Sequence, residues 1–163
     1  MNILVLPDVF WPDHTGGISK SLLPEVEALA ARGHHIVVIT RRLEQSLSYY
    51  ETRGIYELYR YSSPAKGTVF YRLYPLFSIR QVRKLCPQLH KKYQFNVAYV
   101  HNPFQAVGFL QAFKQMPYVY VFHAPIPREV EVEVKKGKYG IVTPLAKPII
   151  RWIKAKESRA LKH

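Results

Sequence analysis

The sequence is poor in cysteine, in acidic side chains and in long apolar runs. Its one cysteine, Cys86, excludes an internal disulfide and favours a reducing compartment. Apolar runs such as Ile36–Ile39 are far shorter than the roughly 18 to 20 residues that a membrane-spanning helix needs. The first apolar stretch ends at Pro7 and follows no basic segment, so it does not fit a signal peptide. We therefore expect a cytoplasmic protein.

The shortage of acidic side chains is the clearest anomaly of the composition. The 163 residues contain 11 Asp and Glu against 24 Lys and Arg, which gives a formal net charge of +13. Such an imbalance implies an acidic partner, whether nucleic acid, a phosphorylated ligand or an anionic membrane surface. The length and the 48% apolar content predict one folded domain over residues 1–163.

The apolar pattern predicts strands that alternate with helices. Residues 3–6 precede Pro7 and indicate a strand buried on both faces. A helix is expected over residues 19–32, with Ser19 as its cap and Gly33 as its left-handed end. Further strands are predicted at 35–40, 55–61, 97–100 and 118–122. Further helices are predicted at 68–93, with a break at Pro75, and at 104–115. This alternation indicates an α/β fold, Rossmann-like and doubly wound, with a mainly parallel sheet.

The adjacent glycines Gly16 and Gly17 stand between the first strand and the first helix. Parallel sheets bind ligands at the carboxyl ends of their strands. A glycine pair at a helix start offers backbone N–H groups and the positive end of the helix dipole, which suits a phosphate. The alternative is a tight turn that needs positive φ. The spacing matches neither a Walker A loop nor the G-x-G-x-x-G fingerprint.

Two histidines follow predicted strands. His123 comes after the apolar run 119–122, so we expect it at a carboxyl strand end, level with the glycine loop. His101 has the same place after 98–100. A histidine there can donate to a phosphate or a hydroxyl, or it can simply cap the strand. No His, Cys or carboxylate group has the spacing of metal ligands, so no metal is expected.

Several segments together resemble the amino-terminal domain of family 4 glycosyltransferases, which have the GT-B architecture. The resemblance begins with residues 2–6, Trp11-Pro12 and Gly16-Gly17-Ile18. Residues 25–40 are similar to the family's helix, "rGHeV" turn and second strand. Residues 95–102 resemble the segment usually written fDvvhaH, with Asn96 in place of the usual Asp, and residues 119–123 resemble the strand that delivers the active-site histidine.

The resemblance implies retaining transfer of a sugar from a nucleotide-sugar donor to a glycan or lipid-linked acceptor, as in hexosyltransferases, without a metal or other cofactor. The site would be a cleft between two Rossmann-like domains, of which the amino-terminal one holds the acceptor. The resemblance places Gly16 and Gly17 near the donor diphosphate and makes His123 the catalytic residue at the donor sugar. His101, Asn102 and Glu129 are the other residues expected to bind substrate.

The resemblance covers only one half of a GT-B enzyme. The family's carboxyl-terminal nucleotide-sugar domain would follow residue 163 and is absent from this sequence. We therefore expect the chain to be an acceptor-side domain that is inactive without its second domain.

Other partners and functions stay open. Cations concentrate over residues 80–92 and 135–162, and such segments can lie on an anionic bilayer, which would place the protein on the inner face of a membrane. An alternative function is a basic α/β nucleic-acid-binding module, although no helix-turn-helix, RNP or zinc pattern is present. Another is a non-catalytic scaffold fragment that has kept the fold.

Overall fold

The computed structural model describes residues 1–64, 68–123, 132, 151–152, 154–155 and 158. The chain divides into two compact units, Met1–Val121 and Phe122–His163. The expectation of one domain over residues 1–163 stays a prediction, and the description below concerns the first unit. Within the described residues, no helix is both long and apolar enough to cross a bilayer.

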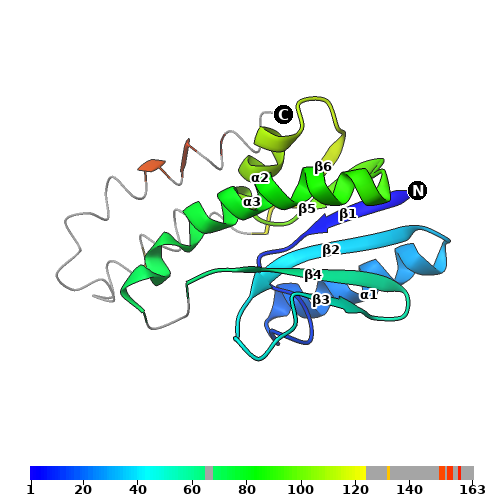
Figure 1. Cartoon of the computed structure of the whole chain (residues 1–163), viewed down its shortest axis with the longest axis horizontal. Helices are drawn as coiled ribbons and strands as arrows, with labels where there is room; N and C mark the ends of the chain where they lie inside the picture. Colours follow the sequence, from blue (N-terminus) through cyan, green and yellow to red (C-terminus); the bar gives the residue numbers. More distant parts are fainter. Residues whose placement is uncertain (65–67, 124–131, 133–150, 153, 156–157, 159–163) are drawn as a thin grey trace. The chain divides into compact units, whose positions relative to one another are not determined.

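The first unit is built on a sheet that has six strands within the described residues, in the order β3-β4-β2-β1-β5-β6 (Figure 1). Neighbouring strands run parallel except for the antiparallel pair β3 and β4. The strands are β1 Asn2–Leu6, β2 His35–Arg42, β3 Tyr50–Thr52, β4 Tyr56–Ser62, β5 Val97–Val100 and β6 Tyr118–Tyr120. The chain winds outward from β1 in both directions, which confirms the predicted doubly wound α/β fold.

Helices cover both faces of this sheet. In Figure 1 the strands lie between α1 on one side and the pair α2 and α3 on the other. The helices are α1 Gly17–Ala31, α2 Tyr74–Tyr93 and α3 Pro103–Ala112, and a 3-10 helix at Val69–Leu73 leads into α2. Because β1 and β2 are covered on both faces, Leu4, Val5 and the run Ile36–Ile39 are fully buried. This explains why their sequences are continuous apolar runs rather than alternating ones.

Helix α1 begins two residues earlier than predicted. Its N-cap residue is Gly16, and Ser19 is not the cap. The Ser19 side chain is buried and donates a hydrogen bond to the Val9 carbonyl at 3.3 Å. The predicted end of the helix is confirmed, because Gly33 has a φ of +81° and its N–H donates to the Ala30 carbonyl at 2.9 Å.

The edge of the sheet also differs from the prediction. Strand β3 was not expected, because three residues are too few to show a period in the sequence. It pairs with β4 across a turn that contains Gly54, whose φ is +67°. By contrast, the break expected near Pro75 in the helical segment 68–93 is confirmed: the 3-10 helix ends at Leu73, and Pro75 occupies the first turn of α2, where the missing N–H costs nothing.

Candidate functional site

The carboxyl ends of β1, β2 and β5 meet at one edge of the sheet. Leu6 pairs with Val100 of β5, so the chain leaves β1 and β5 at the same level, whereas β2 continues beyond Val38, the partner of Val5, to Arg42. Helix α3 begins just after β5, and a loop leads from β1 to α1. This edge therefore gathers the residues that follow three strands, which is the usual ligand-binding position in such a sheet.

Neither Gly16 nor Gly17 has a positive φ. Among the described residues, the glycines with positive φ are Gly33 and Gly54, so the tight-turn explanation of the pair is wrong. A Cβ on Gly16 would lie 2.5 Å from Cε1 of His14, which is closer than real atoms approach. A Cβ on Gly17 would meet no described atom within 4 Å. Gly17 therefore faces open space at the start of α1.

The first turn of α1 has the features of an anion site. No side chain among the described residues caps it, and it contains no acidic residue. The first N–H groups of a helix lack partners within the helix and carry a partial positive charge. The loop just before it is held by His14, whose Nδ1 accepts the Gly16 N–H at 3.1 Å. The opening at Gly17 thus lies beside donors that suit a phosphate.

A buried ion pair anchors the same loop to β4. Arg60 donates from Nε and Nη2 to the two oxygens of Asp13, at 2.5 and 2.9 Å. The side chains of Arg60 and Asp13 are 0% and 1% exposed. Arg60 also donates to the Ser48 carbonyl at 3.0 Å and to Glu51 at 2.9 Å. The position of the loop therefore depends on a contact between residues 47 apart in the sequence.

A second charged pair, which the sequence analysis missed, lies at the ends of β1 and β2. Arg41 donates from Nη2 to Oδ2 of Asp8 at 2.8 Å, and its guanidinium lies 4.7 Å from the centre of the Tyr74 ring. Burial raises the pKa of Asp8, and Arg41 offsets this only in part. Oδ1 of Asp8 and Nε of Arg41 are buried without a hydrogen-bond partner among the described residues. The available signal was a charged residue two positions after each buried apolar run.

A network of buried hydrogen bonds joins the strand ends to α2 and α3. Nε2 of Gln105 on α3 donates to the Pro7 carbonyl at 2.6 Å and to the Tyr61 hydroxyl at 3.0 Å. The Tyr61 hydroxyl in turn donates to Oγ of Ser78 on α2 at 3.1 Å. Burial raises the pKa of Tyr61. The network ties β1, β4, α2 and α3 together, so the edge of the sheet has rigid support.

His101 and Asn102 lie at the end of β5, where the sequence analysis places them. Oδ1 of Asn102 accepts the Phe104 N–H at 2.9 Å and so caps α3. The ring of His101 packs edge-on against Tyr99, with 4.3 Å between ring centres. Both side chains are buried. These contacts give both residues a structural function, and substrate binding by them stays a prediction.

The other two predicted site residues lie outside the first unit. His123 belongs to the unit Phe122–His163, and its side chain is exposed. The strand expected to carry it is shorter than predicted, because β6 ends at Tyr120. Glu129 lies outside the described residues. The roles expected for both stay predictions. Among the described residues, no group of His, Cys and carboxylates could hold a metal ion.

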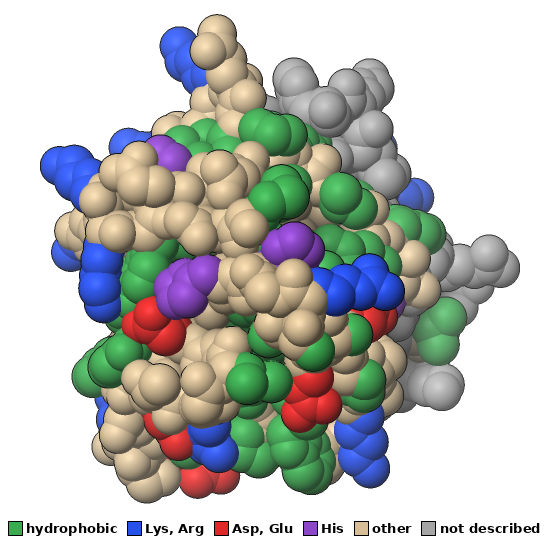
Figure 2. All heavy atoms as spheres, turned by 90° about the vertical axis from the view of Figure 1, so that its right-hand side faces the viewer, with side chains coloured by type: hydrophobic (Ala, Val, Ile, Leu, Met, Phe, Trp, Pro, Cys, Tyr) green, Lys and Arg blue, Asp and Glu red, His purple; other side chains and the backbone are tan. Residues whose placement is uncertain are grey.

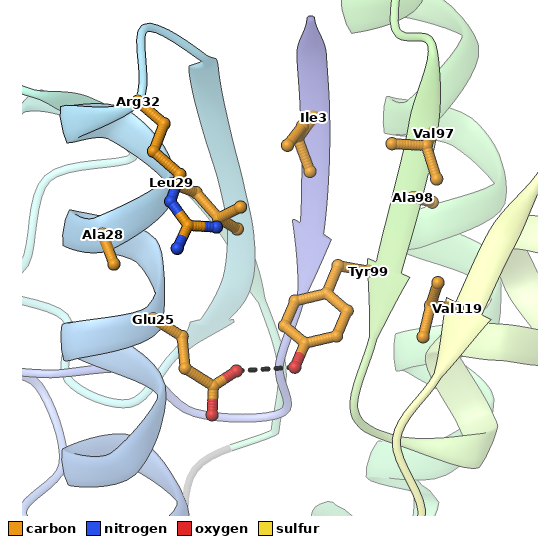
Figure 3. Close-up of a pocket in the computed structure, with 9 residues that line it drawn as sticks. All are labelled: Ile3, Glu25, Ala28, Leu29, Arg32, Val97, Ala98, Tyr99 and Val119. Carbon is orange, nitrogen blue, oxygen red and sulfur yellow. Dashed lines mark hydrogen bonds between the residues drawn. The ribbon is translucent and has the colours of Figure 1, made fainter.

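A groove of about 380 Å³ lies elsewhere, on the face of the sheet beside α1 (Figure 3). Its walls are mostly apolar, and it contains none of the predicted site residues. The Tyr99 hydroxyl donates to Glu25 across the groove at 2.5 Å. Burial, together with Glu25, raises the pKa of Tyr99 to about 12. The lining residues come from α1 and three strands: Ile3, Glu25, Ala28, Leu29, Arg32, Val97, Ala98, Tyr99 and Val119.

The fold and the strand ends define a Rossmann-like α/β domain with a candidate anion site at the start of its first helix. The family model described as Glycosyltransferase Family 4 matches residues 15–163. The chain therefore belongs to glycosyltransferase family 4. The matched region includes the glycine pair, His101 and His123, and it begins after Asp8. A sequence comparison with curated proteins finds no match.

Solved structures support the same fold. The chain is similar to sucrose-phosphate synthase from Thermosynechococcus elongatus, with a TM-score of 0.62 and 16% identity over 91% of this chain. A second structure of that synthase, on a shorter chain, matches with a TM-score of 0.55 and 16% identity over 82% of this chain and 70% of its own. The match covers 39% of the longer synthase chain, so the likeness concerns one part of that enzyme.

Proposed function

We propose that this chain is the acceptor-side domain of a GT-B glycosyltransferase that transfers a hexosyl group with retention. The donor is a nucleotide sugar, the acceptor is a glycan or a lipid-linked sugar, and a carboxyl-terminal domain outside this chain binds the nucleotide. Family membership supports glycosyl transfer in general. The observation that carries the finer proposal is the open, uncapped start of α1 at Gly17.

The start of α1 would bind the donor diphosphate. As the bond to the sugar breaks, negative charge grows on this diphosphate leaving group. Oriented N–H groups and the helix dipole stabilise such a charge without a metal ion. A side chain at Gly17 would occupy the space that the diphosphate needs, which gives a physical reason for glycine at this position.

The acceptor would lie along the neighbouring strand ends. The side chain of Asp8 is partly exposed there, so its carboxylate can accept a hydrogen bond from an acceptor hydroxyl. His123 would contact the donor sugar, and His101, Asn102 and Glu129 would complete the substrate site, as the family resemblance implies.

The variant Gly17→Val tests the diphosphate site in the longer protein that carries this domain. We expect transfer to fall at least about 100-fold, because one lost electrostatic contact of this kind has such an effect. The free energy of unfolding should change by less than about 1 kcal/mol, because valine and glycine differ little in helix propensity. Glu27→Val is the matched control, since Glu27 is exposed further along α1 and should leave transfer unchanged.

If the Gly17→Val enzyme transfers sugar at the wild-type rate, the start of α1 does not bind the donor diphosphate.

The need for a second domain is tested separately. The purified 163-residue chain should show no turnover, and turnover should appear when the carboxyl-terminal domain is supplied. Transfer by the chain alone would contradict the claim that it needs a second domain. If the chain stays inactive with the second domain present, a non-catalytic scaffold becomes the better explanation.

A further inference from the structure

The 3-10 helix and the start of α2 present large apolar side chains to solvent. Phe70, Leu73, Leu76 and Phe77 are 66%, 42%, 51% and 41% exposed, and we call these four residues the apolar patch. Residues three apart align in a 3-10 helix, and residues three or four apart share a face of an α-helix. The patch is therefore one continuous stripe. The face of α2 that packs on the protein is a different one, formed by Pro75, Ser78, Ile79, Val82, Cys86, Leu89 and Tyr93.

The same exposed stripe continues along α2 as cations. Within α2, Arg80 follows Leu76 by four residues and Lys84 follows Phe77 by seven, so both remain on the stripe. Arg83 lies between them, and all three side chains are exposed. We call Arg80, Arg83 and Lys84 the cationic stripe. Apolar side chains at one end and cations at the other make the outer face of α2 amphipathic along its length.

The sequence around these residues contains no negative charge. Between Glu57 and Glu129 there is no Asp or Glu, whereas the same segment contains ten Lys and Arg. Within the described residues this segment covers most of β4, the 3-10 helix, α2, β5, α3 and β6. Five of its cations lie on α2: Arg80, Arg83, Lys84, Lys91 and Lys92. In Figure 2 the acidic side chains lie in the lower half of the view, and the described residues of α2 and α3 in the upper half show none. The positive charge of the first unit is therefore concentrated on the side covered by α2 and α3.

We propose that the apolar patch and the cationic stripe form a docking surface for an anionic lipid bilayer. The patch would enter the boundary between headgroups and acyl chains, and the stripe would lie among the anionic headgroups. Contiguous exposed apolar side chains on a folded domain mark an interaction site. A nucleic acid would pair with the cations, but its phosphates would leave Leu73 and Leu76 uncovered.

The docking surface adjoins the candidate site. Helix α2 begins beyond the carboxyl edge of the sheet (Figure 1). Its first residue, Tyr74, packs against the guanidinium of Arg41, which pairs with Asp8 at that edge. A lipid-linked acceptor held in the bilayer would therefore reach the strand ends, and this step rests on the proposed function. The docking itself goes beyond it and is tested without any transfer assay.

Co-sedimentation of the chain with lipid vesicles tests the proposal. We expect binding to phosphatidylcholine vesicles that contain about 30% phosphatidylserine and weak binding to pure phosphatidylcholine. The double variant Phe70→Ser/Phe77→Ser should lower the affinity about 100-fold, at about tenfold for each lost side chain. Ile55→Ser is the matched control, because Ile55 is 51% exposed in the β3–β4 turn and should leave the affinity unchanged.

The charge contribution is measured in the same assay. The triple variant Arg80→Gln/Arg83→Gln/Lys84→Gln should also lower the affinity about 100-fold, at about fivefold for each lost cation. The control Lys20→Gln/Arg32→Gln removes two exposed cations, one from α1 and one from its C-cap, and should change the affinity less than about threefold. Raising the salt from about 0.1 to about 0.5 M should reproduce much of the loss in the wild-type chain.

Three outcomes would overturn the proposal. The first is a wild-type chain that does not sediment with anionic vesicles, and the second is a serine double variant that binds as well as the wild type. The third is binding of single-stranded RNA, lost in the glutamine variant but not in the serine variant, without vesicle binding, which would make nucleic acid the partner. All three outcomes are measured as vesicle or RNA binding without a transfer assay, so they are distinct from a failure of the proposed function.

Discussion

Removal of the Arg60 side chain tests whether the glycine loop depends on its anchor to β4. Methionine keeps the length and apolar stem of the arginine without the charge. In Arg60→Met the Asp13 carboxylate loses both of its hydrogen bonds and stays buried, since it is 1% exposed. Breaking a buried pair in this way costs about 3 to 5 kcal/mol, because an uncompensated charge remains in the interior.

The double variant Asp13→Asn/Arg60→Met separates the charge from the shape. Asparagine has the shape of aspartate but no charge. The double variant therefore buries an unpaired amide, whereas Arg60→Met buries an unpaired carboxylate. We expect the loss of stability to fall to about 1 to 3 kcal/mol. The surface variant Arg53→Met is the control, because Arg53 pairs with Glu51 in partial contact with solvent and should change stability by less than about 1 kcal/mol.

Urea unfolding followed by circular dichroism measures these free energies by linear extrapolation. The reasoning is refuted if Arg60→Met loses less than about 1 kcal/mol, or if the double variant is as unstable as the single one. In a complete enzyme, under conditions where Arg60→Met stays folded, transfer should fall as well, because Asp13 positions the loop that leads to Gly17. Unchanged transfer would show that the start of α1 keeps its place without this anchor.

Two further predictions concern the packing of α2. Gly108→Ala would place a Cβ 2.7 Å from the Ile79 carbonyl and 3.0 Å from Cβ of Val82, so α2 and α3 must separate. Overpacking should exceed the gain in helix propensity and lower the free energy of urea unfolding by about 1 to 2 kcal/mol, whereas a more stable variant would contradict the close packing. Burial raises the pKa of the Cys86 thiol, so maleimide should label it in urea but not in the native chain; rapid native labelling would show that α2 opens.

Local patterns were enough to predict most of the elements. The runs at 3–6 and 36–39 are continuously apolar because β1 and β2 are buried on both faces. Gly33 marks the end of α1 because its φ of +81° favours glycine. Strand β3 escaped prediction because it is held by its pairing with β4, which its own three residues do not reveal.

The candidate site was predictable only in part. Its location followed from the rule that ligands bind at the carboxyl ends of parallel strands, and the glycine pair follows the first of them. Ser19 was misplaced because a buried hydrogen bond to Val9 competes with helix capping, and only the folded loop shows that bond. Asp8 was missed because a single aspartate after a strand resembles an ordinary turn residue until Arg41 is placed beside it.

The sequence by itself determined the alternation of strands and helices, the excess of positive charge and the family resemblance. Each of these depends on residue types and on short spacings, so each can be read along the chain. Only the tertiary structure decided that Asp13 pairs with Arg60 and that Gly17 faces open space. It also showed that the 3-10 helix and the start of α2 turn four apolar side chains outward. These facts depend on which distant segments meet in the fold, and no local pattern encodes such a meeting.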